Sequence, residues 1–425
     1  MEYLLILIFI LGYAAITLEH AIKLNKAASA LLAGVLCWTV LILATDSHET
    51  VLHELETHIG EISGILFFLL GAMTIVELID AHDGFDLITE RIHTTDMRRL
   101  LWIVSIITFF LSAVLDNLAT AIVMVSLLRK LIDDREKRLF FAGIVVVAAN
   151  AGGAWSPLGD VTTTMLWIGG QITALNIVKM LFLPSLVCLV VPLLILGRRL
   201  KGQVDKPEAE AKILSDTRAR EKNTVFAVGV GALLFVPVFK TLTGLPPFMG
   251  MLFSLGVMWV VTESIHSGKD EAEKGLLSVN HALRKIDTPS ILFFLGILVA
   301  ISALQSAGIL GGLAQWLDRT VGNITAIVMI IGFLSAVVDN VPLVAAAQGM
   351  YGMEQYHTDH YFWEFLAYCA GTGGSALIIG SAAGIAAMGM EKIDFFWYLR
   401  RITVWAVIGY VAGAAAYVAQ YALFH

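Results

Sequence analysis

The sequence is poor in charged residues and in proline for its length. Only 15% of the 425 residues are charged and 9 are proline, whereas 58% are hydrophobic. A soluble domain is closer to a quarter charged and half apolar, so this composition excludes a soluble multidomain enzyme. The three cysteines, Cys37, Cys188 and Cys369, lie inside apolar segments and predict no disulfide framework. The net charge of −7 disfavours nucleic acid as a partner, and the lipid bilayer becomes the expected environment.

Apolar segments recur along the whole chain. They are roughly 17–20 residues long, which is enough to cross about 30 Å of hydrocarbon as a helix. The strands of a transmembrane β-barrel would be shorter and alternating. Residues 3–19 form the first segment, and no basic region precedes it. We therefore expect a retained membrane helix rather than a cleaved signal peptide, and no appended soluble domain.

The positions of lysine and arginine predict the orientation, because these residues mark the cytoplasmic ends of membrane helices. Lys23 and Lys26 follow the first span. The second span is 27–45, and the loop after it has no lysine or arginine. The third span, 62–79, leads to several arginines. These three loops alternate in, out and in, so the N-terminus is predicted to be outside.

Residues 100–128 form an apolar segment with basic residues at both ends, so both ends are predicted to be cytoplasmic. The segment is too short for two crossings of about 20 residues each, and Asp116 and Asn117 lie in its middle. We therefore expect a re-entrant hairpin that turns at these two residues. Irregular backbone at membrane depth is tolerated only where it is buried in protein or lines a cavity.

The second half of the chain repeats the first. The pattern FLSAV-x-DN occurs at 110–117 and at 333–340, and a Gly-Gly pair occurs at 152–153 and at 373–374. The pentapeptide ILFFL also recurs, in the same order. The flanking charges of the second copy are reversed, so the repeats are predicted to be inverted. Inverted repeats whose broken helices meet at the midplane are the architecture of secondary transporters.

The predicted fold class is an all-α polytopic membrane protein, built as an inverted repeat with two re-entrant hairpins and two broken transmembrane helices. We expect ten crossings and both termini outside. The predicted boundaries are a first repeat at 1–200 (hairpin 100–128, break 150–163), a cytoplasmic linker at 201–222 and a second repeat at 223–425 (hairpin 322–350, break 371–384).

Three carboxylates, Asp116, Asp160 and Asp339, fall in the predicted tips and breaks, and no lysine or arginine lies inside these breaks. A charge at the bilayer centre is costly, so by default it is functional or paired. The alternative is that these aspartates only cap the N-termini of half-helices. Carboxylates with exposed carbonyls suit a small hard cation such as Na⁺ or Li⁺, or a proton. The predicted cation- and proton-binding residues are Asp116, Asn117, Asn150, Asp160, Thr162, Thr163, Ser335, Asp339, Asn340, Thr372, Ser375 and Ser381, with the three aspartates as Na⁺ ligands.

The segments SAVLDNLATA and ANAGGAWSPLGD, together with SAVVDN and GTGGSALIIGS, resemble the NhaD-type sodium/proton antiporters of the ion transporter superfamily. The resemblance covers essentially the whole chain. It implies exchange of Na⁺ (and Li⁺) for H⁺, a homodimer, and a transport domain that moves against a scaffold. Dicarboxylate relatives carry Ser-Asn-Thr at the tips. Asp116 and Asp339 replace that serine here, which disfavours an anionic substrate.

The leading hypothesis is therefore Na⁺/H⁺ exchange by alternating access in a bacterial cytoplasmic (inner) membrane, with no cofactor beyond the transported ions. One alternative is a Na⁺-coupled anion carrier of the same fold, for a dicarboxylate or arsenite, and another is a passive cation channel. Asp160 aligns with Ser381, so the two halves are not equivalent. Close carboxylates favour retention of a proton, and we expect Na⁺ binding to release it.

Two further features have competing interpretations. HETVLH and HELETH, within 48–58, resemble zinc-protease motifs, but the histidines are five residues apart and not the four that one helical face requires. We interpret them as solvated loop histidines. With His357 and His360 they lie on the predicted outer face, so a role in pH sensing stays open. Glu77 is either a pathway residue or a side chain that reaches the interface.

Overall fold

The computed structural model describes residues 2–89, 92, 94–205, 219–268 and 275–424. The middle of the predicted linker, 206–218, lies outside the described residues. Helices make up most of the described chain, and no β-strand occurs in it. Nine described helices are long and apolar enough to cross a membrane. The protein is therefore an all-α polytopic membrane protein, as predicted.

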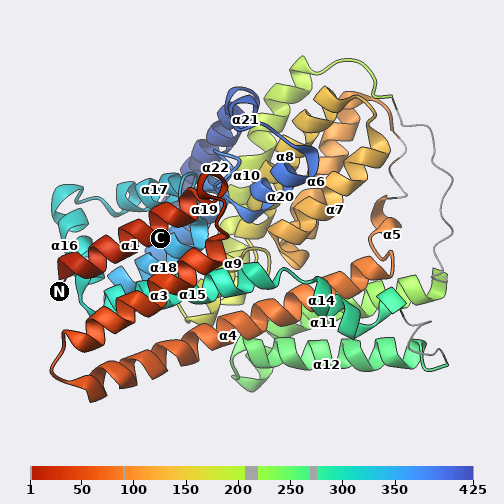
Figure 1. Ribbon diagram of the computed structural model, residues 1–425. Coiled ribbons are helices and arrows are strands. Elements are labelled where there is room, and N and C mark those ends of the chain that lie inside the picture. Colours follow the sequence, from red (N-terminus) through yellow and green to blue (C-terminus); the bar gives the residue numbers. More distant parts are fainter. Residues whose placement is uncertain (1, 90–91, 93, 206–218, 269–274, 425) are drawn as a thin grey trace.

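The helices form two bundles that lie side by side (Figure 1). We call the first the long-helix bundle. It contains α1 (Glu2–Thr17), α3 (Lys26–Leu43), α4 (His48–Ala81), α11 (Ala219–Thr243), α12 (Pro247–Ile265) and α15 (Thr288–Ser306).

We call the second the hairpin bundle. It contains α6 (Met97–Leu115), α7 (Asn117–Leu131), α8 (Arg135–Ala154), α9 (Val161–Ile168), α10 (Ala174–Arg199), α17 (Ile324–Leu334), α18 (Asn340–Met350), α19 (Tyr361–Gly373), α20 (Ala382–Glu391), α21 (Phe395–Arg401) and α22 (Thr403–Phe424). Two short helices connect the bundles, α5 (Asp86–Thr89) and α16 (Ile309–Thr320). Three others connect helices within the long-helix bundle: α2 (Glu19–Ile22), η1 (Gly275–Leu277) and α14 (Val279–Lys285).

Residues 97–131 do not form one helix. The chain turns at Asp116, which has a φ of 84°, and α6 packs against α7 (Figure 1). Both ends of the pair bond to the same short segment: Met97 N–H donates to the Gly202 carbonyl at 3.1 Å, and Asp133 N–H donates to the Asp205 carbonyl at 2.9 Å. The two ends therefore lie together, which is the geometry of a hairpin.

The second hairpin is built from α17 and α18, which are separated by a turn at 335–339. Its ends also lie together, because the Tyr351 hydroxyl, just after α18, donates to Asp318 Oδ1 at 3.1 Å. Asp318 belongs to α16, which precedes α17. Both FLSAV-x-DN segments therefore occupy helix–turn–helix junctions, whereas their opposite orientation in the membrane stays a prediction.

The two predicted breaks are shorter than expected. α8 continues through Asn150 and the Gly-Gly pair to Ala154, and α19 continues to Gly373. These glycines remain helical because they serve close packing. A Cβ on Gly152 would lie 2.2 Å from the Phe109 carbonyl oxygen, and one on Gly373 would lie 2.0 Å from that of Gly332. Phe109 and Gly332 are equivalent positions of the two halves, so the halves share this contact.

The predicted loop before the third span is helical. α4 begins at His48 and has 34 residues, about 51 Å at 1.5 Å per residue, which is longer than the bilayer core. His48, His53 and His58 are therefore helical and not loop residues. Glu77, near the other end of α4, pairs with Lys285 Nζ at 2.9 Å, which favours an interfacial ion pair over a pathway role.

Contacts at the two ends of the protein agree with the predicted sides. At the predicted cytoplasmic end, Asp86 pairs with Lys130 at 3.8 Å and with Lys222 at 3.7 Å. At the predicted outer end, Asp359 Oδ2 accepts a hydrogen bond from the Thr173 hydroxyl at 2.7 Å. Each contact joins residues that the charge pattern assigns to the same side.

Candidate functional site

Four half-helices begin at the tips and breaks, and a polar side chain caps the N-terminus of each. Asp116 Oδ1 accepts the Ala119 N–H at 2.8 Å ahead of α7, and Asp160 Oδ1 accepts the Thr162 N–H at 2.9 Å ahead of α9. Asp339 caps α18 and Ser381 caps α20. Capping is therefore real, but Ser381 shows that a neutral hydroxyl performs it. The negative charges of the three aspartates need another explanation.

Asp160 lies at the centre of a buried polar network and is 1% exposed. Its Oδ1 also accepts a hydrogen bond from the Thr162 hydroxyl at 2.7 Å. Its Oδ2 accepts one from Asn117 Nδ2, at the tip of the first hairpin, at 2.8 Å. Asn340 Nδ2, at the tip of the second hairpin, lies 3.5 Å from Oδ1. One carboxylate thus meets side chains from both hairpins.

Asn150 connects this network to the second break. Its Oδ1 accepts from Asn117 Nδ2 at 3.1 Å, and its Nδ2 lies 2.9 Å from the hydroxyl oxygens of both Ser375 and Ser381. Seven of the twelve predicted residues therefore form one hydrogen-bonded network that draws on both tips and both breaks: Asn117, Asn150, Asp160, Thr162, Asn340, Ser375 and Ser381.

The other five predicted residues lie outside this network. Asp116 and Asp339 use their carboxylates as caps, although each precedes an asparagine that belongs to it. The Ser335 hydroxyl bonds to the carbonyls of Gly332 and Ala370, and the Thr372 hydroxyl bonds to the Tyr368 carbonyl. Hydroxyls in membrane helices often bond to backbone in this way. The buried Thr163 hydroxyl has no hydrogen-bond partner among the described residues, so its oxygen is available for a ligand.

The three carboxylates do not have equal surroundings. Asp116 and Asp160 accept hydrogen bonds from neutral groups. Asp339 instead has a basic neighbour, because Lys26 Nζ lies 4.0 Å from its Oδ2. No lysine or arginine lies inside the breaks themselves, so this basic partner of Asp339 comes from elsewhere in the chain. Lys26 is 313 positions away and belongs to the other bundle, so no local pattern indicated the contact.

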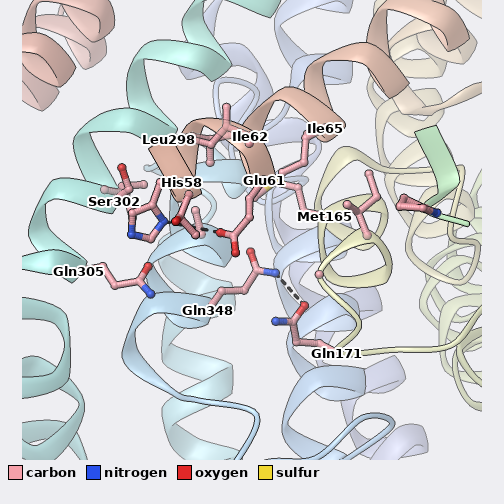
Figure 2. Close-up of a pocket in the computed structure, with 18 of the residues that line it drawn as sticks. His58, Glu61, Ile62, Ile65, Met165, Gln171, Leu298, Ser302, Gln305 and Gln348 are labelled. Carbon is pink, nitrogen blue, oxygen red and sulfur yellow. Dashed lines mark hydrogen bonds and ion pairs between the residues drawn. The ribbon is translucent and has the colours of Figure 1, made fainter. Parts of the chain in front are cut away.

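Two cavities approach the network from the two predicted sides. The larger has a volume of about 700 Å³ and is shown in Figure 2. His58 and Glu61 of α4 face it, with Gln348 of α18 and Gln171, whose side chains are joined by a 2.9 Å hydrogen bond. Met165 of α9 also lines it, five residues after Asp160. The cavity thus reaches the half-helices that carry the network, from the predicted outer side.

The smaller cavity has a volume of about 330 Å³, and Asp339 and Lys26 both line it. Glu19 and Asp287, from segments that are predicted to be cytoplasmic, also line it. The tip of the second hairpin is therefore the part of the site that this cavity reaches.

Two buried acids of the hairpin bundle, Glu364 and Glu391, were not among the predicted site residues. Glu364 of α19 accepts hydrogen bonds from Tyr417 at 2.7 Å and from Asn176. Glu391, at the end of α20, pairs with Arg129 Nε at 2.6 Å and with Arg138 Nε at 2.9 Å. Glu364 lies within an apolar segment and Glu391 is the last residue of its helix, so neither position stood out in the sequence. Their partners come from distant helices, and they do not contact the Asp160 network in the hydrogen bonds described above.

The network combines one buried carboxylate with amide and hydroxyl oxygens on the N-termini of four half-helices. Each helix N-terminus carries roughly half a positive charge, which stabilises nearby carboxylates in their charged form. An asparagine that donates its amide NH2 to Asp160 can rotate its amide group and turn the amide oxygen toward the site instead. The same groups can therefore donate hydrogen bonds to the carboxylate when no cation is bound, or supply the oxygen ligands that a hard cation prefers.

Comparison with known proteins identifies the family. The CitMHS family model, described as citrate transporter, matches residues 5–368. "Sodium/proton antiporter 1" of Arabidopsis thaliana is 52% identical over 98% of this chain and 72% of that protein. "Sodium/proton antiporter 2" of the same plant is 49% identical over 97% of this chain and 98% of that protein. "Na(+)/H(+) antiporter NhaD" of Vibrio cholerae is 30% identical over 96% of this chain and 90% of that protein. The chain belongs to the CitMHS family of membrane transporters, and NhaD-type antiporters are among its relatives.

Proposed function

We propose that this protein exchanges Na⁺ (and Li⁺) for H⁺ across the membrane by alternating access, with Asp160 as the main shared site. The observation that carries the proposal is the network around Asp160, in which neutral side chains from both hairpin tips and both breaks surround one buried carboxylate. A cation and a proton can each neutralise this carboxylate, and they compete for it. The relatives named as sodium/proton antiporters support the same substrates.

The test is ΔpH-driven flux in everted membrane vesicles across a panel of Na⁺, Li⁺, K⁺ and choline. We expect Na⁺ and Li⁺ to dissipate the imposed pH gradient with saturation, and the apparent Na⁺ affinity to strengthen as the pH rises. Conductance that is independent of a proton gradient would instead identify a passive channel. No response to any of the cations would overturn the proposal.

The second candidate is a Na⁺-coupled carrier of an anion such as citrate. It is favoured by the description of the family model and by the ammonium group of Lys26 beside the second tip. Uptake of labelled citrate into right-side-out vesicles, with and without Na⁺, distinguishes the two functions. Uptake of citrate without any Na⁺/H⁺ exchange would replace our proposal by this one.

We also propose the setting in which the exchange occurs. The protein lies in a bacterial cytoplasmic (inner) membrane as a homodimer, with both termini outside, and carries no catalytic activity and no cofactor. Support comes from the charge pattern for the orientation and from family resemblance for the dimer. Light scattering of the detergent-solubilised protein tests the dimer, and protease protection of terminal tags tests the orientation.

A further inference from the structure

Lys26 is held between the two bundles. It is the first residue of α3, and its ammonium group lies 4.5 Å from the centroid of the Phe293 ring on α15. The same ammonium is 4.0 Å from Asp339 Oδ2 at the tip of the second hairpin, and the two side chains are 23% and 18% exposed. An aromatic face and a carboxylate both attract a cation, so Lys26 occupies a cation-binding position.

This position is open to the cavity of about 330 Å³. An ion that enters there from the predicted cytoplasmic side meets Lys26 and Asp339 before it reaches the deeper network. Glu19 and Asp287 line the same cavity, so an ammonium group that leaves Asp339 can move toward other carboxylates and keep its charge. Glu19 is already close to Lys26, whose backbone N–H it accepts at 3.2 Å.

A sodium ion and an ammonium group compete for one carboxylate. Both carry a single positive charge, and placing both against Asp339 would add their mutual repulsion to the site. Asp116 and Asp160 show no ion pair within the described parts of the chain, so only one of the three carboxylates has this competition built in.

We infer that Lys26 is the resident counter-ion of Asp339 in the empty site and is displaced into the cavity when Na⁺ binds. The inference rests on the proposed Na⁺/H⁺ exchange. Displacement also breaks an ion pair between the two bundles, because α3 belongs to the long-helix bundle and Asp339 to the hairpin bundle. Cation binding thereby releases a connection that opposes movement of one bundle past the other.

The first test compares the Na⁺ kinetics of Lys26→Gln with those of the wild type in everted vesicles at alkaline pH, where proton competition is weakest. Without the ammonium group Asp339 is uncompensated, so we expect the apparent KM for Na⁺ to fall about fivefold, as for a partly exposed ion pair, and the maximal rate to fall because Na⁺ leaves more slowly. Lys26→Arg should restore the wild-type KM. The matched control is Lys23→Gln, since Lys23 is exposed three residues earlier and should have no effect.

The second test needs no transport. Acylation of lysines in the purified protein is measured by mass spectrometry, with NaCl or choline chloride at equal ionic strength, and Lys26 labelling is divided by that of Lys23. Sodium should raise this ratio in the wild type. Asp339→Asn should raise it without sodium, and sodium should then add nothing.

The outcomes separate the inference from the function on which it rests. Na⁺ exchange by the wild type, combined with an unchanged KM in Lys26→Gln and Na⁺-independent labelling, would overturn the inference alone and leave Lys26 as a structural ion pair. Absence of Na⁺ exchange in the wild type would overturn the proposed function and this inference together.

Discussion

Asn117 and Asp160 are 43 residues apart in the chain, yet the Asn117 side-chain amide donates to Asp160 Oδ2 at 2.8 Å. The bond joins the tip of the first hairpin to the N-terminus of α9. It fixes the orientation of the carboxylate, while the second oxygen of Asp160 faces Thr162 and Asn340. The carboxylate is therefore positioned by neutral donors, each of which can rearrange when a cation takes its place.

Replacement of Asp160 by asparagine tests whether the charge or the cap matters. The amide keeps the size and can still cap α9, so we expect a folded protein with a wild-type Tm. Exchange should be abolished, and any residual Na⁺ binding should lose its pH dependence. The measurements are ΔpH-driven Na⁺ flux and thermal unfolding in detergent.

The matched control for this substitution is Asp134→Asn. Asp134 caps α8 through the Lys137 N–H at 2.8 Å, but it is exposed and far from the network in the chain. Exchange should persist in this variant. Wild-type exchange in Asp160→Asn would assign the proton-carrying role to Asp116 and Asp339 alone.

The hairpin geometry predicts which positions share a side of the membrane. Single cysteines at Arg98 and Lys130, in a background without the three native cysteines, should both react with a membrane-impermeant maleimide only from the cytoplasm. A cysteine at Glu354, which is exposed after α18, should react only from outside. Labelling of Arg98 and Lys130 from opposite sides would show that 97–131 crosses the membrane.

The glycine contacts predict a strong effect of a single methyl group. In Gly373→Ala the new Cβ would lie 2.0 Å from the Gly332 carbonyl oxygen, a contact that backbone movement must relieve. Overpacking of this kind costs about 1–3 kcal/mol, so we expect a lower Tm in detergent together with impaired exchange. Gly256→Ala is the control, because a Cβ at this position of α12 would meet nothing within 4 Å and alanine favours a helix. Equal Tm values for the two variants would contradict this packing.

Glu391 is predicted to hold the ends of three helices together. It is 6% exposed and pairs with Arg129 and Arg138, so Glu391→Gln leaves two arginines with weakened partners. Arg129 is half exposed and Arg138 is partly exposed, so water compensates for part of the lost pairing. We expect a cost of about 1–2 kcal/mol and a lower Tm. The apparent KM for Na⁺ should stay at the wild-type value, since Glu391 lies outside the Asp160 network. A changed KM with an unchanged Tm would place Glu391 in the transport path instead.

The sequence was sufficient to predict the class of the fold, because apolar length and flanking charge determine where helices cross a bilayer. Seven of the twelve residues predicted to bind cations or protons meet in one network, as expected for polar side chains that are costly in a membrane unless they are paired or functional. Their role in ion binding stays a prediction. The extents of the breaks were wrong because Gly152 and Gly373 are used for close packing within helices, which composition alone does not distinguish from helix breaking. The contact between Lys26 and Asp339 depends on how two bundles pack, and neither residue carries a local sign of it.

The close approach of Gly152 to Phe109 and of Gly373 to Gly332 makes each hairpin and its neighbouring broken helix a single mechanical part. At these two contacts the backbones of the hairpin and the broken helix touch directly. No side chain lies between them that could rotate and let the hairpin slide past the helix. We therefore expect that neither tip swings open as an independent gate. We expect access to change by movement of the assembled part along α4 and α15, which contact α9 and α18 of the hairpin bundle.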